Sequence, residues 1–167
     1  KFEVPSRKWF DQTDKSGKFG VSILEDCKFG SDKPDANTIR LTLLFTPEVK
    51  NNFVVQKSQD WGIHEFKYGI YAHAGDWKKA LTPWQGQSFN QPMLAFSADK
   101  HQGNSGKYIS LVKISSSQVG LMALKKMEHS DYYVIRVNEL LGKNAQNIHV
   151  KFPMNIVDAY EVNGLRC

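Results

Sequence analysis

The sequence lacks most of the features that assign a chain to a specialised class. It has two cysteines in 167 residues, too few for a disulfide framework. No apolar run approaches the length of a membrane span, and no Asn-x-Ser/Thr acceptor occurs. Internal repeats and low-complexity segments are also missing. These absences indicate an ordinary globular chain with no membrane partner, and they leave cytoplasmic and periplasmic locations open.

Arginine is scarce, and the positive charge is scattered. The net charge is +5 and the isoelectric point is near 9.1. The basic residues stand as singles and short pairs, such as Lys78-Lys79, whereas a nucleic-acid footprint would gather them on one stripe. We therefore expect a solvated basic surface and no nucleic-acid partner. The first residue, Lys1, has no signal-like segment after it, which indicates an excised or processed piece.

Long helical periodicity is missing too, while strand patterns recur along the chain. The strongest is Gly62–His73, where His64, Ile70 and Ala72 point one way and Tyr71 and His73 the other. Further strands are predicted at the start of 20–30 and over 38–45, 92–98, 108–114, 119–127, 132–139, 147–152 and 155–162, with 31–37 and 47–60 as loops. The pattern predicts an all-β fold, an antiparallel β-sandwich rather than a barrel.

The strand pattern is interrupted at two places. A turn after Ala74 is expected to open a short helix with Asp76 as N-cap, limited by Pro83 and Gly86. A soft boundary at Ser115–Gln118 divides the chain into 1–114, with long loops, and 115–167, with compact hairpins.

The stretch from Gly20 to Gly30 reads Gly-Val-Ser-Ile-Leu-Glu-Asp-Cys-Lys-Phe-Gly. It begins as a strand and ends with charges around a thiol, whereas plain turns use Gly, Asn, Pro and Ser. Cys27 beside Lys28 allows a nucleophile, but a buried structural thiol is the favoured interpretation. A bridge from Cys27 to Cys167 stays open. Among the carboxylates, Asp26 is the preferred candidate for a functional role because of its position at the strand end.

Metal ligands and sugar-stacking aromatics have weaker support. His64 and His73 are nine residues apart, so on one strand they face opposite sides of the sheet. We therefore expect no metal site, and we interpret His64 as a hydrogen-bonded core histidine. Trp77 and Trp84 lie in loop-like sequence and could stack on sugar rings, or they could be sandwich core.

Several motifs in order resemble glycoside hydrolase family 38, the α-mannosidases. Gly20–Gly30 is similar to the family's Gly-Val-x-Leu-Leu-Asn-Asp-Cys-Lys-Tyr-Gly, with Glu25 where Asn is usual. His64–Trp77 resembles its His-x-Phe-x-Tyr-x-Leu-Tyr-Pro-His-x-Gly-x-Trp, with Ala72 in place of Pro. Similar segments continue at Thr38–Leu44, Phe89–Pro92 and Val119–Glu139.

The resemblance implies a C-terminal piece of a large, retaining, zinc-dependent α-mannosidase. Residues 1–114 would be the later part of a large β-sandwich, and 115–167 a smaller β-domain. The catalytic residues and zinc ligands belong to the family's N-terminal domain, which nothing here resembles, so the piece alone should be inactive and hold no metal. Its expected partners are that catalytic domain and mannose-containing glycans. Asp26, Lys28, His64 and Trp77 are the candidate sugar-binding residues. A stand-alone carbohydrate-binding module is the alternative.

Overall fold

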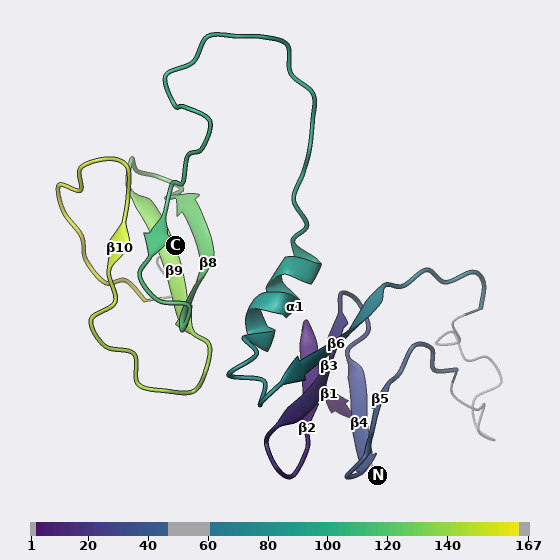
Figure 1. Cartoon of the computed structure of the whole chain (residues 1–167). Helices are drawn as coiled ribbons and strands as arrows, with labels where there is room; N and C mark the ends of the chain where they lie inside the picture. Colours follow the sequence, from purple (N-terminus) through teal and green to yellow (C-terminus); the bar gives the residue numbers. More distant parts are fainter. Residues whose placement is uncertain (1–2, 47–60, 164–167) are drawn as a thin grey trace. The chain divides into compact units, whose positions relative to one another are not determined.

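A computed structural model describes residues 3–46 and 61–163 (Figure 1). These residues fall into two compact units, Lys1–Ala95 and Phe96–Cys167. The loop predicted over 47–60 and the residue Cys167 lie outside the described residues. The domain division at residue 114 stays a prediction.

The first unit contains two antiparallel three-stranded sheets and one helix. One sheet has the order β1-β4-β5 and the other the order β2-β3-β6. The elements are β1 (Val4–Pro5), β2 (Trp9–Thr13), β3 (Phe19–Glu25), β4 (Gly30–Asp35), β5 (Thr38–Leu41), β6 (Tyr68–Ala74) and α1 (Thr82–Asn90). The predicted all-β class with antiparallel sheets is therefore confirmed, and a short helix follows the turn after Ala74, as expected.

The strand pairs β2–β3 and β1–β4 follow each other along the same two segments of chain. Together they form one bent two-stranded ribbon that takes part in both sheets. The pairing of β2 with β3 ends at Trp9 and Leu24, and the pairing of β1 with β4 resumes at Pro5 and Gly30. Two hydrogen bonds hold the bend between them, from Glu25 N to Lys8 O (3.0 Å) and from Ser6 N to Phe29 O (2.8 Å). Lys8 itself has a positive φ of 69°. Such a bend lets a strand pair pass from one sheet of a sandwich to the other.

Helix α1 covers one face of the β2-β3-β6 sheet. A Cβ on Gly69 would lie 3.2 Å from the Phe89 ring of the helix, and one on Gly86 would lie 2.8 Å from Cδ1 of Trp9. Because side chains alternate along a strand, Tyr71 and His73 lie on this covered face with Gly69. Ile70 and Ala72 point to the opposite face, where Ile70 is 71% exposed.

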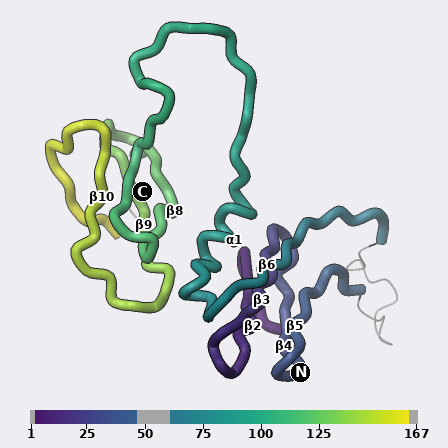
Figure 2. The backbone as a smooth tube through the Cα atoms, viewed as in Figure 1, coloured from purple at the N-terminus to yellow at the C-terminus, as the bar shows by residue number. Residues whose placement is uncertain are grey.

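The second unit consists of two antiparallel strand pairs. The long hairpin joins β8 (Val119–Lys126) to β9 (Tyr133–Glu139), with a bulge between Leu121 and Ala123. The short pair joins β7 (Lys113–Ile114) to β10 (Val150–Lys151). The trace in Figure 2 curves through turns and a loop between these strands, and a long stretch without regular structure precedes β7.

Several predicted elements need correction. Residues 31–37, predicted as a loop, contain β4. Its Pro34 lies where the register between β4 and β5 shifts, so the missing proline amide breaks no regular ladder. Residues 92–98 and 155–162 form no strand, and the strands predicted over 38–45, 62–73, 108–114 and 147–152 are shorter than expected. A short strand over Trp9–Thr13 was not predicted.

The helix also differs from the expectation at its start. Asp76 accepts a hydrogen bond from Lys79 N (2.8 Å) and so caps a turn that precedes α1. Pro83 lies in the first helical turn, where proline is compatible with a helix, and Gly86 lies inside the helix against Trp9. Neither residue limits the helix as predicted. No helix in the described part of the chain is long and apolar enough to cross a membrane.

The buried apolar core is small. Among the described residues, Leu24 (9% exposed) and Val119 (7%) are the buried hydrophobic side chains, while Ile63, Met93 and Val157 are almost fully exposed. The fully buried side chains in these ranges are polar, namely Glu25, Thr82 and Ser22. A chain that buries polar groups and exposes apolar ones has surfaces suited to contact with more protein.

Candidate functional site

The loop Asp26-Cys27-Lys28 leaves the end of β3 beside the segment that leads into β6. Glu25 pairs with Tyr68 in the ladder between these strands, so the loop continues alongside residues 64–67. The Lys28 ammonium lies 5.2 Å from the centre of the Phe66 ring, a cation–π contact. Asp26 is exposed and Lys28 half-buried. The two side chains form no ion pair with each other, so the loop presents a carboxylate and an ammonium as separate groups.

Cys27 is a free, exposed cysteine, which corrects the expectation of a buried structural thiol. A hydrogen bond with Asp26 raises the pKa of the Cys27 thiol, and the Asp26 charge acts in the same direction. The opposing influence of Lys28 is smaller. Because the thiolate is the reactive form, this environment makes Cys27 a poor nucleophile.

The other two candidate sugar-binding residues lie in different settings. His64 is exposed and precedes β6, so it is not the core histidine that we predicted. Trp77 follows the opposite end of β6, where it is half-buried. Its ring centre lies 5.2 Å from that of Trp9, and the Lys78 ammonium lies 5.1 Å from it. The structure therefore gathers Asp26, Lys28 and the segment containing His64 at one end of the sheet, with Trp77 in the helical layer.

A buried polar cluster, missed by the sequence analysis, lies beneath α1. Asp11 is its centre: Oδ1 accepts hydrogen bonds from Ser22 Oγ (2.7 Å) and from His73 Nε2 (2.7 Å), and Oδ2 accepts one from Thr13 (2.8 Å). Ser22 Oγ also lies 3.1 Å from Thr82 Oγ1 of the helix. The cluster therefore ties three strands and α1 together.

The geometry of this cluster indicates a structural role and does not activate Ser22 as a nucleophile. The Ser22 hydroxyl donates to Asp11 and not to His73, so the serine–histidine hydrogen bond of a nucleophilic triad is missing. Ser22 and Thr82 have no exposed surface, and the His73 and Asp11 side chains are 2% and 5% exposed. A substrate could not reach these atoms without opening the sheet.

The pairing register of β2, β3 and β6 could have revealed that these polar residues lie close together. Asp11 pairs with Ser22, Ser22 with Tyr71, and Gly20 with His73, so all of these residues share the face under the helix. Asp11 begins the polar run Asp-Gln-Thr-Asp-Lys-Ser-Gly, which shows no strand pattern, so the sequence alone did not indicate how the two strands align.

The comparisons with known proteins identify the family. Residues 118–166 match the "Glycosyl hydrolases family 38 C-terminal beta sandwich domain". The chain is 31% identical to "Alpha-mannosidase G" of Dictyostelium discoideum over 144 residues, and 43% identical to "Alpha-mannosidase" of Saccharomyces cerevisiae over 75 residues. The chain belongs to the C-terminal region of glycosyl hydrolase family 38. No solved structure matches it.

This family 38 chain spans a small part of those relatives. The match to the Dictyostelium protein covers 85% of the chain but 12% of the relative, and the match to the yeast protein covers 45% and 6%. The similarity predicted from Gly20–Gly30 and His64–Trp77 is thus confirmed at the level of the family.

The metal that the family implies does not fit the residues described here. Within residues 3–46 and 61–163, no three His, Cys, Asp or Glu side chains lie close enough together to hold a metal ion. His73 is committed to Asp11, and His64 lies outside the same strand. The described residues of this chain therefore offer no ligand set for zinc.

Proposed function

We propose that this chain is the non-catalytic C-terminal part of an α-mannosidase, and that it packs against the catalytic domain and helps to wall the sugar site. The parent protein would hydrolyse α-mannosidic bonds in glycans with retention, using zinc held by a domain outside these 167 residues. The two α-mannosidase relatives and the matched family support the activity of the parent.

The observation that carries the scaffold role is the inverted burial of β6. His73, a polar residue, is 7% exposed under the helix, whereas Ile70 on the other face is 71% exposed. A β-sheet in a sandwich normally buries its apolar face against a second sheet. The open Ile70 face therefore supports a role as one layer of a larger β-structure.

The loop Asp26-Cys27-Lys28 is the proposed point of contact with sugar. Asp26 and Lys28 are not neutralised by each other, and the loop extends from a rigid strand pair. A carboxylate and an ammonium held in this way can hydrogen bond to sugar hydroxyls and orient the ring for attack. His64, from the adjoining segment, would add a third polar group.

A carbohydrate-binding module without catalysis is the second candidate. The exposed Trp61 (81% exposed) favours it, because a free aromatic ring can stack on a sugar. Trp77 does not add to that surface, since its ring is engaged by Trp9 and Lys78.

The deciding experiment combines three measurements. The purified chain is titrated with α-mannosides by tryptophan fluorescence, its zinc content is analysed, and the mannosidase activity of chain and parent is assayed. We expect activity in the parent only, with no zinc and no saturable binding in the chain. Activity of the chain alone would overturn the scaffold role, and saturable binding by the chain would favour the module.

A further inference from the structure

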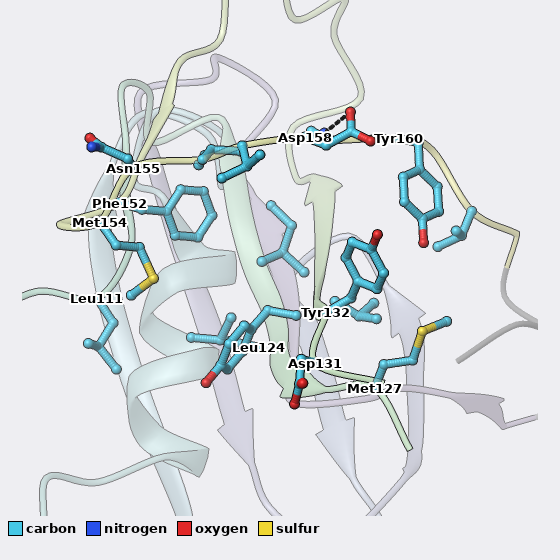
Figure 3. A pocket seen from close by; sticks show the side chains of 17 residues that line it. Leu111, Leu124, Met127, Asp131, Tyr132, Phe152, Met154, Asn155, Asp158 and Tyr160 are labelled. Atoms are coloured by element: carbon cyan, nitrogen blue, oxygen red, sulfur yellow. Dashed lines mark hydrogen bonds between the residues drawn. The ribbon is translucent and has the colours of Figure 1, made fainter. Parts of the chain in front are cut away.

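The second unit contains an apolar groove beside its hairpin, with lining residues from both β8 and β9 (Figure 3). Its volume is about 630 Å³. The groove is lined by β9 and its preceding turn, by Leu124 of β8, by Leu111 and by residues within 152–162. Large side chains such as Tyr132 (52% exposed) and Ile156 (55%) remain accessible there. The groove is thus open to a partner.

Residues 155–162, which border the groove, have almost no backbone hydrogen bonds in the described structure. Residues 155–162 read as a strand by sequence, yet they belong to no strand of the described structure. Within that structure, the one hydrogen bond from their amides is Ala159 N to the neighbouring Asp158 Oδ1 (2.8 Å). A β-prone segment with free amides and carbonyls is a template for another strand.

The sheets of this unit are also too small to be complete. Each contains two strands, and the hairpin β8–β9 uses one edge of each strand. An isolated two-stranded sheet is at best marginally stable in water, and a third strand is the usual remedy. Val119 is the buried apolar side chain among the described residues of this unit. The missing stabilisation has to come from additional apolar contacts.

We infer that a β-strand from the parent polypeptide outside these 167 residues lies in this groove and pairs with the backbone of residues 155–162. The inference rests on the proposed function in that the chain is part of a longer protein, and the matched relatives are many times longer than the matched region. The side chains that the strand would contact are apolar: Tyr132, Tyr160, Met154 and Ile156. Main-chain bonds would supply affinity, and these side chains specificity.

Two other occupants are less well supported. A groove of this volume could hold a small apolar molecule, but such a ligand would leave the amides of 155–162 without partners. A second copy of the chain would place an identical 155–162 segment in the groove, and its pairing would then depend on protein concentration.

The test is hydrogen–deuterium exchange in the intact parent protein. Amides of 155–162 should exchange at least about 100-fold more slowly than an unpaired chain, because strand pairing protects them. Peptides from β8 and from the exposed turn at Glu128 serve as protected and unprotected references. Exchange of 155–162 at the unpaired rate in the parent would overturn the inference, as would protection that appears only at high protein concentration.

A pair of variants sharpens the result. Val157 is 100% exposed within this chain, so V157K removes no contact described here. If a partner strand covers the segment in the parent, V157K should speed exchange of 155–162 at least tenfold, whereas Q146K, at an exposed position outside the groove, should change nothing. Equal, unchanged exchange in both variants would contradict strand addition. Loss of mannosidase activity is a separate readout: a protected segment in a parent without that activity would refute the proposed function and leave this inference standing.

Discussion

His73 Nε2 lies 2.7 Å from Asp11 Oδ1, and the two side chains are 2% and 5% exposed. This pair is the most deeply buried ionisable contact among the described residues. It joins the edge strand β2 to the edge strand β6 across β3, which lies between them. The pair therefore links the two edge strands of the three-stranded sheet through their side chains.

Removing the Asp11 carboxylate should destabilise the first unit strongly. Asp11→Ala leaves two buried donors, on Ser22 and His73, and the half-buried hydroxyl of Thr13 without their acceptor. We expect a loss of about 3 kcal/mol in the free energy of unfolding, as is typical when one partner of a buried pair is removed. Urea unfolding followed by tryptophan fluorescence measures it. Lys126→Ala, which removes an exposed partner of Asp131, is the control and should change little. Equal unfolding free energies of D11A and the unsubstituted chain would show that the cluster does not stabilise the first unit.

Gly20 should tolerate no side chain. A Cβ there would lie 2.3 Å from Cε1 of His73, so the imidazole would have to move away from Asp11. Gly20→Ala is expected to cost about 1–3 kcal/mol through overpacking, with lower thermal stability as the measured effect. Gly103→Ala is the matched control, because the nearest atom to a Cβ there is 4.0 Å away. A Gly20→Ala protein with an unchanged melting temperature would mean that His73 can shift freely.

Much of this architecture follows from local patterns, and the remainder depends on contacts that a pattern does not contain. The alternation over Tyr68–Ala74 correctly separated Ile70 from Tyr71 and His73. It did not indicate which face is covered, because burial usually follows the apolar face, and here α1 covers the polar one. The predicted strand over 155–162 has no ladder within the described residues, since pairing requires a partner that the sequence of one segment cannot supply.

In the candidate site, too, local patterns predicted some features, while others depend on contacts between distant residues. The sequence identified Asp26 and Lys28 at the end of a strand, and the structure places them there as exposed or half-buried groups. The buried cluster around Asp11 arises from the registers of β2 on β3 and of β3 on β6, which bring Asp11 together with residues eleven and 62 positions away. His64 was misplaced because the strand was predicted to begin at Gly62, whereas it begins at Tyr68.

Glu25 should make the stability of the first unit depend on pH. Its side chain has no exposed surface, and neither carboxylate oxygen has a hydrogen bond of regular geometry. Burial raises the pKa of Glu25, against a lowering influence of the backbone amides of Lys8 and Lys28. The folded state then holds its proton more tightly than the unfolded state. Stability is complete below the ordinary glutamate pKa and declines as pH rises through the raised value.

Two variants test this dependence. Glu25→Gln keeps the size of the side chain but cannot ionise, and Glu25→Asn introduces the residue usual in the resembling family motif. Both should be more stable than the parent sequence at neutral pH, and the slope of unfolding free energy against pH should flatten between pH 4 and the raised pKa. Urea titrations across that pH range measure the slope. An identical slope in Glu25→Gln would assign the pH dependence to other groups.

Asp26 and Lys28 should affect catalysis by the parent rather than its stability. Both side chains extend from a loop and form no ion pair with each other, so replacing either by alanine removes little folding energy. If they orient a sugar ring, Asp26→Ala and Lys28→Ala should each lower kcat/KM for α-mannosides by about 10- to 100-fold, as misplacement of a substrate does. Lys33→Ala, an exposed lysine on the neighbouring strand β4, is the matched control and should leave kcat/KM unchanged. A lower melting temperature with normal turnover would instead make the loop a structural contact between this chain and the catalytic domain.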